Sequence, residues 1–343
     1  MRARGIYFLF LTLIGGSLPA SARQEQLPTA KGAEAQTGNI KLPVSTENWN
    51  LISDIKTGLV PRSPSLIQSD EQPEFVRDLF RLQWREGDPI DVWLIRPKVA
   101  GKVPAKSPVI VYLYNFNDKG ERFRDNEWCK RAAADGYAAV GFISALTDYR
   151  FRNHGLSKWF VSELAESLGS TTHDVQLILN FLAQRGDIDM GRVGMFGLGS
   201  GATIAILSAQ ADLRISALDV IDPWGDWPDW FANSAIVPPN ERPNYESEEF
   251  MHRISTLDPI VYFATLRTPS VRLQQMLSDP VTPPRAKERI SAAAPFRATT
   301  VKYQSTQDLF KSWQSAGLAG WIKQQLHSQP VPVAGDDHHA AKK

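Results

Sequence analysis

Hydrophobic positions in the middle of the chain switch repeatedly between short continuous runs and a helical spacing. Continuous apolar runs, which predict strands buried on both faces, lie at residues 107–114 and 136–142, and segments 269–276 and 298–304 are further strand candidates. Apolar residues three and four positions apart predict a helix over residues 174–182, and residues 128–134 are a further helix candidate. Segments 79–84 and 91–95 flank Gly87-Asp88-Pro89 and predict an antiparallel hairpin. This alternation predicts the α/β class, with a mostly parallel central sheet and helices on both faces.

One strand–turn–helix segment, residues 192–203, is especially informative. A short apolar strand runs into a Gly-rich turn and then into an Ala- and Ile-rich helix, which is the layout of the Gly-x-Ser-x-Gly nucleophile elbow. The residues two positions from the apex must be small, because strand and helix backbones nearly touch there. Gly197 and Gly201 satisfy this when Gly199 is the apex, whereas a shift by one residue would place Leu198 at a crowded position. The sequence therefore predicts Gly199 at the nucleophile position; a Gly-rich turn with no catalytic meaning is the alternative.

The order and spacing of these segments resemble the α/β-hydrolase superfamily over roughly residues 75–326. The resemblance is nearest to esterases and peptidase-like hydrolases of the dienelactone hydrolase and acetyl xylan esterase type, and residues 185–192 match the start of the elbow strand in that family. It implies an α/β-hydrolase fold with a small cap. Neither the resemblance nor the residues indicate a metal or an organic cofactor.

The same resemblance implies a catalytic acid after a late strand and a catalytic histidine after the last one. Asp279 matches the acid position and Asp222 is a weaker candidate, although an Asp before Pro also commonly caps a turn. Residues 305–309, after the last predicted strand, contain no histidine, so Thr306 or Gln307 holds the position of the base. Four other histidines do not fit the expected order: His154, His173, His252 and His327.

The loop expected to form the oxyanion hole reads Asn115-Phe116, where many relatives have His-Gly. Its donors are mainly backbone N–H groups, which survive substitution, and the amide of Ser200 lies at a helix N-terminus. We therefore expect a pocket for an anion or a carbonyl oxygen around Asn115, Phe116, Gly199, Ser200 and Trp224.

Three tryptophans, Trp224, Trp227 and Trp230, crowd the segment after one predicted strand, where this fold builds its cap. An aromatic platform for a sugar or apolar ligand is one interpretation. A cap that packs on the domain and shields its own apolar surface is the preferred one, because no sugar-binding polar pattern accompanies the rings.

The chain has 343 residues, 43% of them hydrophobic, and a net charge of +1, which argues against a nucleic-acid partner. The single cysteine, Cys129, excludes an internal disulfide. The acidic and histidine-containing stretch 336–339 is interpreted as solvated tail and not as a metal site.

The N-terminus predicts export to the periplasm or beyond. Arg2 and Arg4 precede the apolar run 6–14, and Ala20-Ser21-Ala22 supplies a cleavage site of small residues. The apolar run is short for a membrane span, so no membrane association is expected once the leader is cleaved. The predicted organisation is a signal peptide at 1–22, a partly disordered extension at 23–72, a hydrolase-like domain at 73–327 and a flexible tail at 328–343.

Three functions remain open. The leading hypothesis is an exported, catalytically inactive α/β-hydrolase-fold protein that binds a small ester, carboxylate or carbonyl ligand, or a protein partner. The alternative is an active carboxylesterase or acyl hydrolase that uses Ser200 with Asp279. The second alternative is a structural envelope protein, for which the pocket would be filled.

Overall fold

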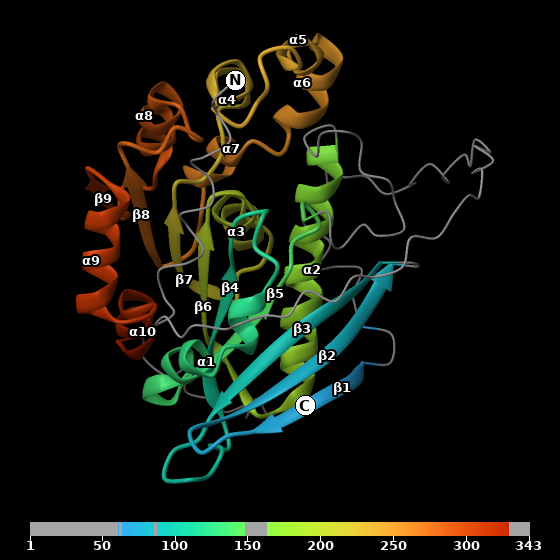
Figure 1. Ribbon diagram of the computed structural model, residues 1–343, viewed down its shortest axis with the longest axis vertical. Coiled ribbons are helices and arrows are strands. Elements are labelled where there is room, and N and C mark those ends of the chain that lie inside the picture. Colours follow the sequence, from blue (N-terminus) through green and yellow to red (C-terminus); the bar gives the residue numbers. More distant parts are fainter. Residues whose placement is uncertain (1–60, 62–63, 86–87, 148–162, 329–343) are drawn as a thin grey trace, which may run out of the picture. The chain divides into compact units, whose positions relative to one another are not determined.

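A computed structural model describes residues 61, 64–85, 88–147 and 163–328. The described residues form one nine-stranded sheet in the order β1-β2-β3-β5-β4-β6-β7-β8-β9 (Figure 1). The strands are β1 (Ser65–Glu71), β2 (Phe75–Arg85), β3 (Asp88–Pro97), β4 (Ser107–Leu113), β5 (Ala138–Phe142), β6 (Ile188–Leu198), β7 (Ile215–Ile221), β8 (Ser270–Met276) and β9 (Thr299–Tyr303).

Helices connect most of these strands. In chain order they are η3 (Glu121–Arg124), α1 (Asn126–Ala132), η4 (Ala134–Gly136), α2 (Leu164–Arg185), α3 (Ser200–Ala211), α4 (Trp227–Asn233), α5 (Arg242–Tyr245), α6 (Glu248–Ser255), α7 (Pro259–Phe263), α8 (Pro284–Ala293), α9 (Thr306–Ala316) and α10 (Gly320–His327). None of the described helices combines the length and the hydrophobicity needed to cross a bilayer.

Strands β4 to β9 are parallel, whereas β1, β2 and β3 join the sheet antiparallel. The α/β class, the mostly parallel sheet and helices on both of its faces are therefore confirmed. The predicted hairpin is β2–β3, but Asp88 and Pro89 belong to β3 and not to its turn. Residues 86–87, between the two strands, lie outside the described residues.

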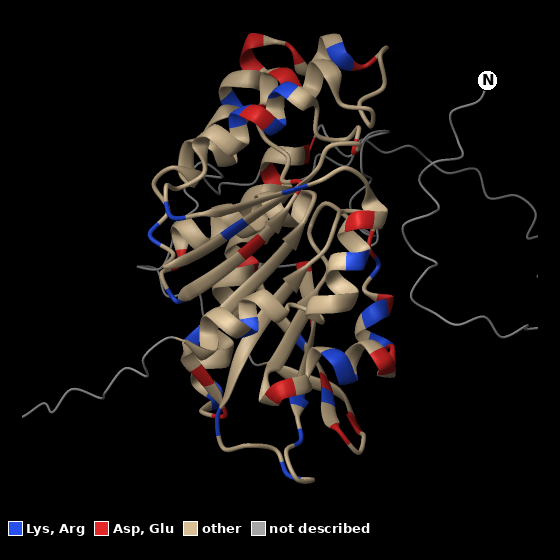
Figure 2. Cartoon of the chain, turned by 90° about the vertical axis from the view of Figure 1, so that its left-hand side faces the viewer, with Lys and Arg blue, Asp and Glu red and all other residues tan. Residues whose placement is uncertain are grey.

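Side chains of β4 alternate between two hydrophobic clusters, one on each face of the sheet. Val109 and Val111 pack in the cluster that includes α2 and α3, and Ile110 and Tyr112 pack in the cluster that includes α1 and α10. Every residue of β4 and β5 is buried and none is charged. Charged residues instead lie mainly on helices and loops, and some lie within the other strands (Figure 2). Both faces of the central strands are thus covered, as their continuous apolar sequences require.

Two predicted boundaries differ from the structure. Strand β1 lies in the segment assigned to the N-terminal extension, and because it pairs with β2 the sheet begins before residue 73. Helix α2 is longer than the predicted segment 174–182, because it extends beyond that segment at both ends, and most of its residues are buried. The predicted leader, most of the extension, and residues 329–343 of the tail lie outside the described residues.

The helices between β7 and β8, α4 to α7, form the cap that the resemblance implied (Figure 1). Trp224, Trp227 and Trp230 have at most 1% of their surface exposed. The ring centroids of Trp224 and Trp230 lie 4.9 Å apart, and those of Trp227 and Trp230 lie 5.7 Å apart. The three rings are therefore the core of the cap and offer almost no surface to a ligand.

Candidate functional site

The turn from β6 into α3 has Gly199 at its apex. Its backbone angles are φ 59° and ψ −120°, a conformation that residues with a side chain rarely adopt. The Gly199 amide donates to the carbonyl oxygen of Ile221 at 2.9 Å, which fixes the turn against β7. The structure thus places Gly199 at the bend, and Ser200 follows it as the first residue of α3.

The glycines on either side of the apex are sterically required. A Cβ built on Gly201 would lie 2.3 Å from the carbonyl oxygen of Leu113, and one on Gly197 would lie 2.6 Å from Cα of Ala202. Both distances are far below any real contact. The crowding that the sequence pattern predicted at these two positions is therefore present in the fold.

Ser200 is fully buried, and its hydroxyl donates to Oδ1 of Asn115 at 3.0 Å. No described histidine bonds to that hydroxyl. A hydroxyl that donates to an amide oxygen is a weak nucleophile unless a base accepts its proton, and no base among the described residues does so.

Three donors converge on Asn115 Oδ1. Besides the Ser200 hydroxyl, the amide N–H of Phe116 donates to it at 3.0 Å and the amide N–H of Ser200 at 3.3 Å. These two amides are the donors from which the sequence predicted an oxyanion pocket. In the structure both of them donate to the same oxygen atom. The oxygen that they share belongs to the protein's own Asn115 side chain.

The Asn115 side chain also fills the space in front of the apex. A Cβ built on Gly199 would lie 2.8 Å from Asn115 Oδ1 and 2.9 Å from its Cγ. A side chain at position 199 and the observed position of Asn115 are therefore incompatible. Nothing in the sequence signalled that Asn115 would occupy this space, because Asn115 is far from the elbow in the chain; Ser200, next to the apex, is 85 positions away.

The loops around this pocket are held by further contacts. The rings of Phe116 and Trp224 lie 5.6 Å apart, between centroids. Thr147 Oγ1 donates to the carbonyl oxygen of Phe116 at 2.6 Å, and Thr203 Oγ1 donates to that of Trp224 at 2.8 Å. All five residues predicted to surround the pocket thus lie in the connected segments around the apex.

The two candidate acids hold backbone groups. Asp279, after β8, accepts a hydrogen bond from the Thr282 amide at 3.2 Å. Asp222, after β7, is 3% exposed and both of its carboxylate oxygens accept from the Met276 amide, at 3.0 and 3.2 Å. The Lys287 ammonium donates to the backbone carbonyl of Asp279 at 2.6 Å.

Asp222 has an unusual protonation behaviour. Burial raises its pKa from 3.8 to about 8; the nearby charge of Asp279 raises it as well, while Lys287 and the Met276 amide oppose the rise. Burial also raises the pKa of Asp279. Asp222 is therefore largely protonated at neutral pH, unlike the ionised acid that orients a catalytic histidine.

The position of the base holds no imidazole. Thr306 and Gln307 form the first turn of α9, which Ser305 caps by accepting from the Asp308 amide at 3.3 Å, and the Gln307 side chain is exposed. Neither Thr306 nor Gln307 makes a side-chain hydrogen bond to Asp279 or Asp222 within the described residues.

Among the described residues, the remaining histidines and possible metal ligands add no catalytic group to this arrangement. His173 is in α2, His252 is in α6, His327 ends α10, and His154 and residues 336–339 lie outside the described residues. In the part of the chain that the structure describes, no three His, Cys, Asp or Glu side chains gather as a metal site would require.

The pKa of Asp222 leads to a prediction about stability. A carboxyl that holds its proton more tightly when folded stabilises the protein fully below about pH 3.8, and this stabilisation is lost as pH rises toward about 8. Asp222→Asn mimics the protonated group, so its stability relative to the wild type should rise with pH, by at most about 1.4 kcal/mol per pH unit. Urea unfolding across this pH range measures the difference. Asp91→Asn, at a partly exposed position of β3, is the control. A stability difference that does not change with pH for either variant would contradict the assignment.

Comparisons with known proteins identify the fold. No protein-family model and no curated protein matches the sequence. Among solved structures, an acetyl xylan esterase from Paenibacillus sp. R4 matches with a TM-score of 0.57 and 17% identity, over 80% of this chain and 97% of that one. Acetyl xylan esterase 1 from Thermoanaerobacterium sp. JW/SL YS485 matches with a TM-score of 0.57 and 16% identity, over 82% and 92%. An acylaminoacyl peptidase from Pyrococcus horikoshii matches with a TM-score of 0.51 and 17% identity, over 68% of this chain but 38% of its own. With its parallel sheet, its strand–glycine–helix turn and these likenesses, the chain has the α/β-hydrolase fold.

Proposed function

We propose that this protein is a catalytically inactive member of the α/β-hydrolase fold, with its own Asn115 in the oxyanion pocket. One observation carries the proposal: Asn115 Oδ1 accepts from the Phe116 and Ser200 amides in front of an apex residue, Gly199, that has no side chain. Acyl transfer by a serine hydrolase needs a hydroxyl at the apex and free donors for the developing oxyanion. Neither requirement is met in this arrangement.

The occupied pocket also lowers the activity that a hydrolase lacking its nucleophile would retain. Oxyanion donors and binding alone leave a residual acceleration of roughly 10³–10⁴ over water in a serine protease without its triad. In this chain a substrate carbonyl would first have to displace Asn115 from the Phe116 and Ser200 amides. A small ester, carboxylate or carbonyl ligand would face the same competition, so the filled pocket favours a structural or protein-binding role over ligand binding at this site.

The alternative, an active hydrolase that uses Ser200 with Asp279, needs several rearrangements. The Ser200 hydroxyl would have to leave Asn115 and find a base, and Asp279 would have to leave the Thr282 amide to orient that base. A labelling experiment separates the two functions.

We expect no serine-dependent labelling by a fluorophosphonate probe. The reason is that the apex has no hydroxyl and the Ser200 hydroxyl is buried and bonded to Asn115. The purified wild type and Ser200→Ala should show the same background labelling and the same turnover of p-nitrophenyl acetate, beside an active esterase as positive control. Labelling and turnover that disappear in Ser200→Ala would overturn the proposal in favour of the active hydrolase.

The steric part of the proposal predicts coupling between Asn115 and Gly199. Gly199→Ala introduces a Cβ that meets Asn115, so it should cost less stability in an Asn115→Ala background, by about 1 kcal/mol or more. The backbone strain of a side chain at this positive φ is present in both backgrounds and cancels in the double-mutant cycle.

Urea unfolding of the four proteins measures that coupling energy. Asn117→Ala, at an exposed position in the same loop, replaces Asn115→Ala in the control cycle and should be additive with Gly199→Ala. Additivity in both cycles would show that Asn115 does not occupy the space in front of the apex.

The proposal includes export, which rests on the leader pattern of residues 1–22. The mature protein is expected to begin just after Ala22 and to be recovered from the periplasm or the medium of the producing cell. N-terminal sequencing of the protein from each fraction tests this, and an intact Met1 in a cytoplasmic fraction would contradict it.

A further inference from the structure

A hollow of about 310 Å³ lies on the antiparallel part of the sheet, two strands or more away from the elbow strand β6 in the sheet order. It is lined by Gln68, Arg77, Leu79, Trp93 and Arg124. These residues come from β1, β2, β3 and η3, and the hydrolase-like chemistry considered above uses none of them. The hollow is near the lower limit of the volumes typical of small-molecule sites.

The floor of the hollow is a row of side chains in register. Gln68 of β1 is opposite Leu79 of β2, and Leu79 is opposite Trp93 of β3. Partners in register point to the same face of a sheet, so these three side chains form one continuous strip. The next row along the same face includes Asp70 opposite Arg77.

The strip is covered at its Trp93 end only. The Phe123 ring of η3 lies over Gly141, where a Cβ would be 2.1 Å from the ring, and it stacks on Trp93 with centroids 5.6 Å apart. At the other end Gln68 is exposed, as is most of β1. The segment η3 therefore forms one wall, and the hollow opens toward β1.

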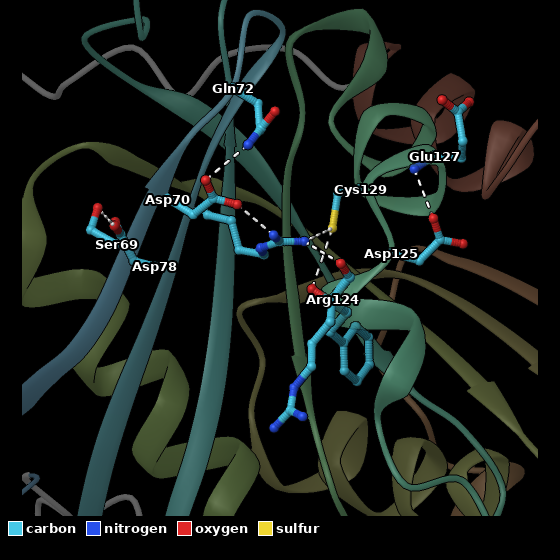
Figure 3. A network of polar contacts seen from close by, with 10 residues as sticks. Ser69, Asp70, Gln72, Asp78, Arg124, Asp125, Glu127 and Cys129 are labelled. Carbon is cyan, nitrogen blue, oxygen red and sulfur yellow. Dashed lines mark hydrogen bonds and ion pairs between the residues drawn. The ribbon is translucent and has the colours of Figure 1, made fainter. Parts of the chain in front are cut away.

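One of the two arginines in the hollow is rigidly held. Arg77 Nη2 pairs with Asp70 at 2.5 Å, and Arg77 Nη1 donates to the backbone carbonyl of Arg124 at 2.6 Å. The other oxygen of Asp70 accepts from Gln72 at 2.8 Å (Figure 3). The charge of Arg77 is thus matched by that of Asp70, and its guanidinium is fixed in place.

The other arginine keeps an unmatched charge. The Arg124 guanidinium lies over the Trp93 ring, 5.5 Å from the centroid, and among the described residues no carboxylate pairs with it. Gln68 likewise makes no side-chain hydrogen bond within the described part of the chain. The hollow therefore offers one net positive charge, one amide group and a small apolar surface made mainly by Leu79, because Trp93 is only 4% exposed beneath Arg124 and Phe123.

We propose that this hollow binds a small monocarboxylate whose carboxylate pairs with Arg124 and whose body packs on Leu79. The planar fork of Arg124 matches a carboxylate in a bidentate pair, and Gln68 can donate to it from the opposite side. A single unmatched guanidinium balances one negative charge, whereas a dianionic phosphate would remain undercompensated beside Asp70. An aromatic acid and a sugar acid share this chemistry.

Calorimetric titration of the full chain distinguishes an aromatic acid from a sugar acid as the ligand. Benzoate represents the aromatic acids and glucuronate the sugar acids, with benzamide and glucose as their uncharged counterparts. We expect one of the two acids to bind measurably and its uncharged counterpart to bind about tenfold more weakly or not at all. The elbow is not involved, so the result is independent of whether the protein hydrolyses esters.

Arg124→Gln should weaken binding of that acid about tenfold or more, and Gln68→Ala should weaken it less. Both side chains are exposed and the Arg124 carbonyl that anchors Arg77 is retained, so the fold should be unaffected. Arg267→Gln, which removes an exposed arginine before β8, should bind the acid like the wild type. Absence of binding by both acids up to about 10 mM, unchanged affinity in Arg124→Gln, or an equal loss in Arg267→Gln would each overturn the proposal.

Discussion

Strand β4 and the turn between β6 and α3 approach each other so closely that only glycine fits between them. The carbonyl oxygen of Leu113 lies where a side chain at Gly201 would begin, and Gly197 faces the backbone of α3 in the same way. This approach brings the end of β4, with Asn115 and Phe116, beside the first residue of α3. The convergence of two backbone amides on one point follows from it, as does the positive φ of Gly199.

Convergent amides that are buried need an acceptor, because an unmet donor costs about 1–3 kcal/mol. In a hydrolase this acceptor is the substrate oxygen for part of the reaction and water for the rest. Here the Asn115 side chain supplies the acceptor, at hydrogen-bond distance from both amides. The Asn115 amide has room in the pocket because Gly199 has no side chain. The two residues together therefore satisfy the pocket's amide donors without a ligand.

The carboxylates near the elbow serve the scaffold in the same way. Asp222 accepts from the amide of Met276, the last residue of β8, and Asp279 accepts from the Thr282 amide in the loop that follows β8. Two carboxyls in a buried setting repel each other when both are charged, and Asp222 is the one that keeps its proton. These groups therefore have a structural task that does not depend on a histidine.

The sequence by itself determined the alternation of strands and helices in the centre of the chain, the position of Gly199 at the bend and the missing histidine after β9. Each of these depends on local rules: apolar periodicity, the need for small residues two positions from a tight bend, and residue identity at a fixed place in the chain. Strand β1 escaped prediction because it is an exposed edge strand with no apolar alternation. Only the tertiary structure decided that Asn115 fills the pocket and that the buried Asp222 lies near enough to Asp279 for their charges to interact. Both outcomes depend on groups that are far apart in the chain and meet where parallel strands end, and no local pattern encodes such a meeting.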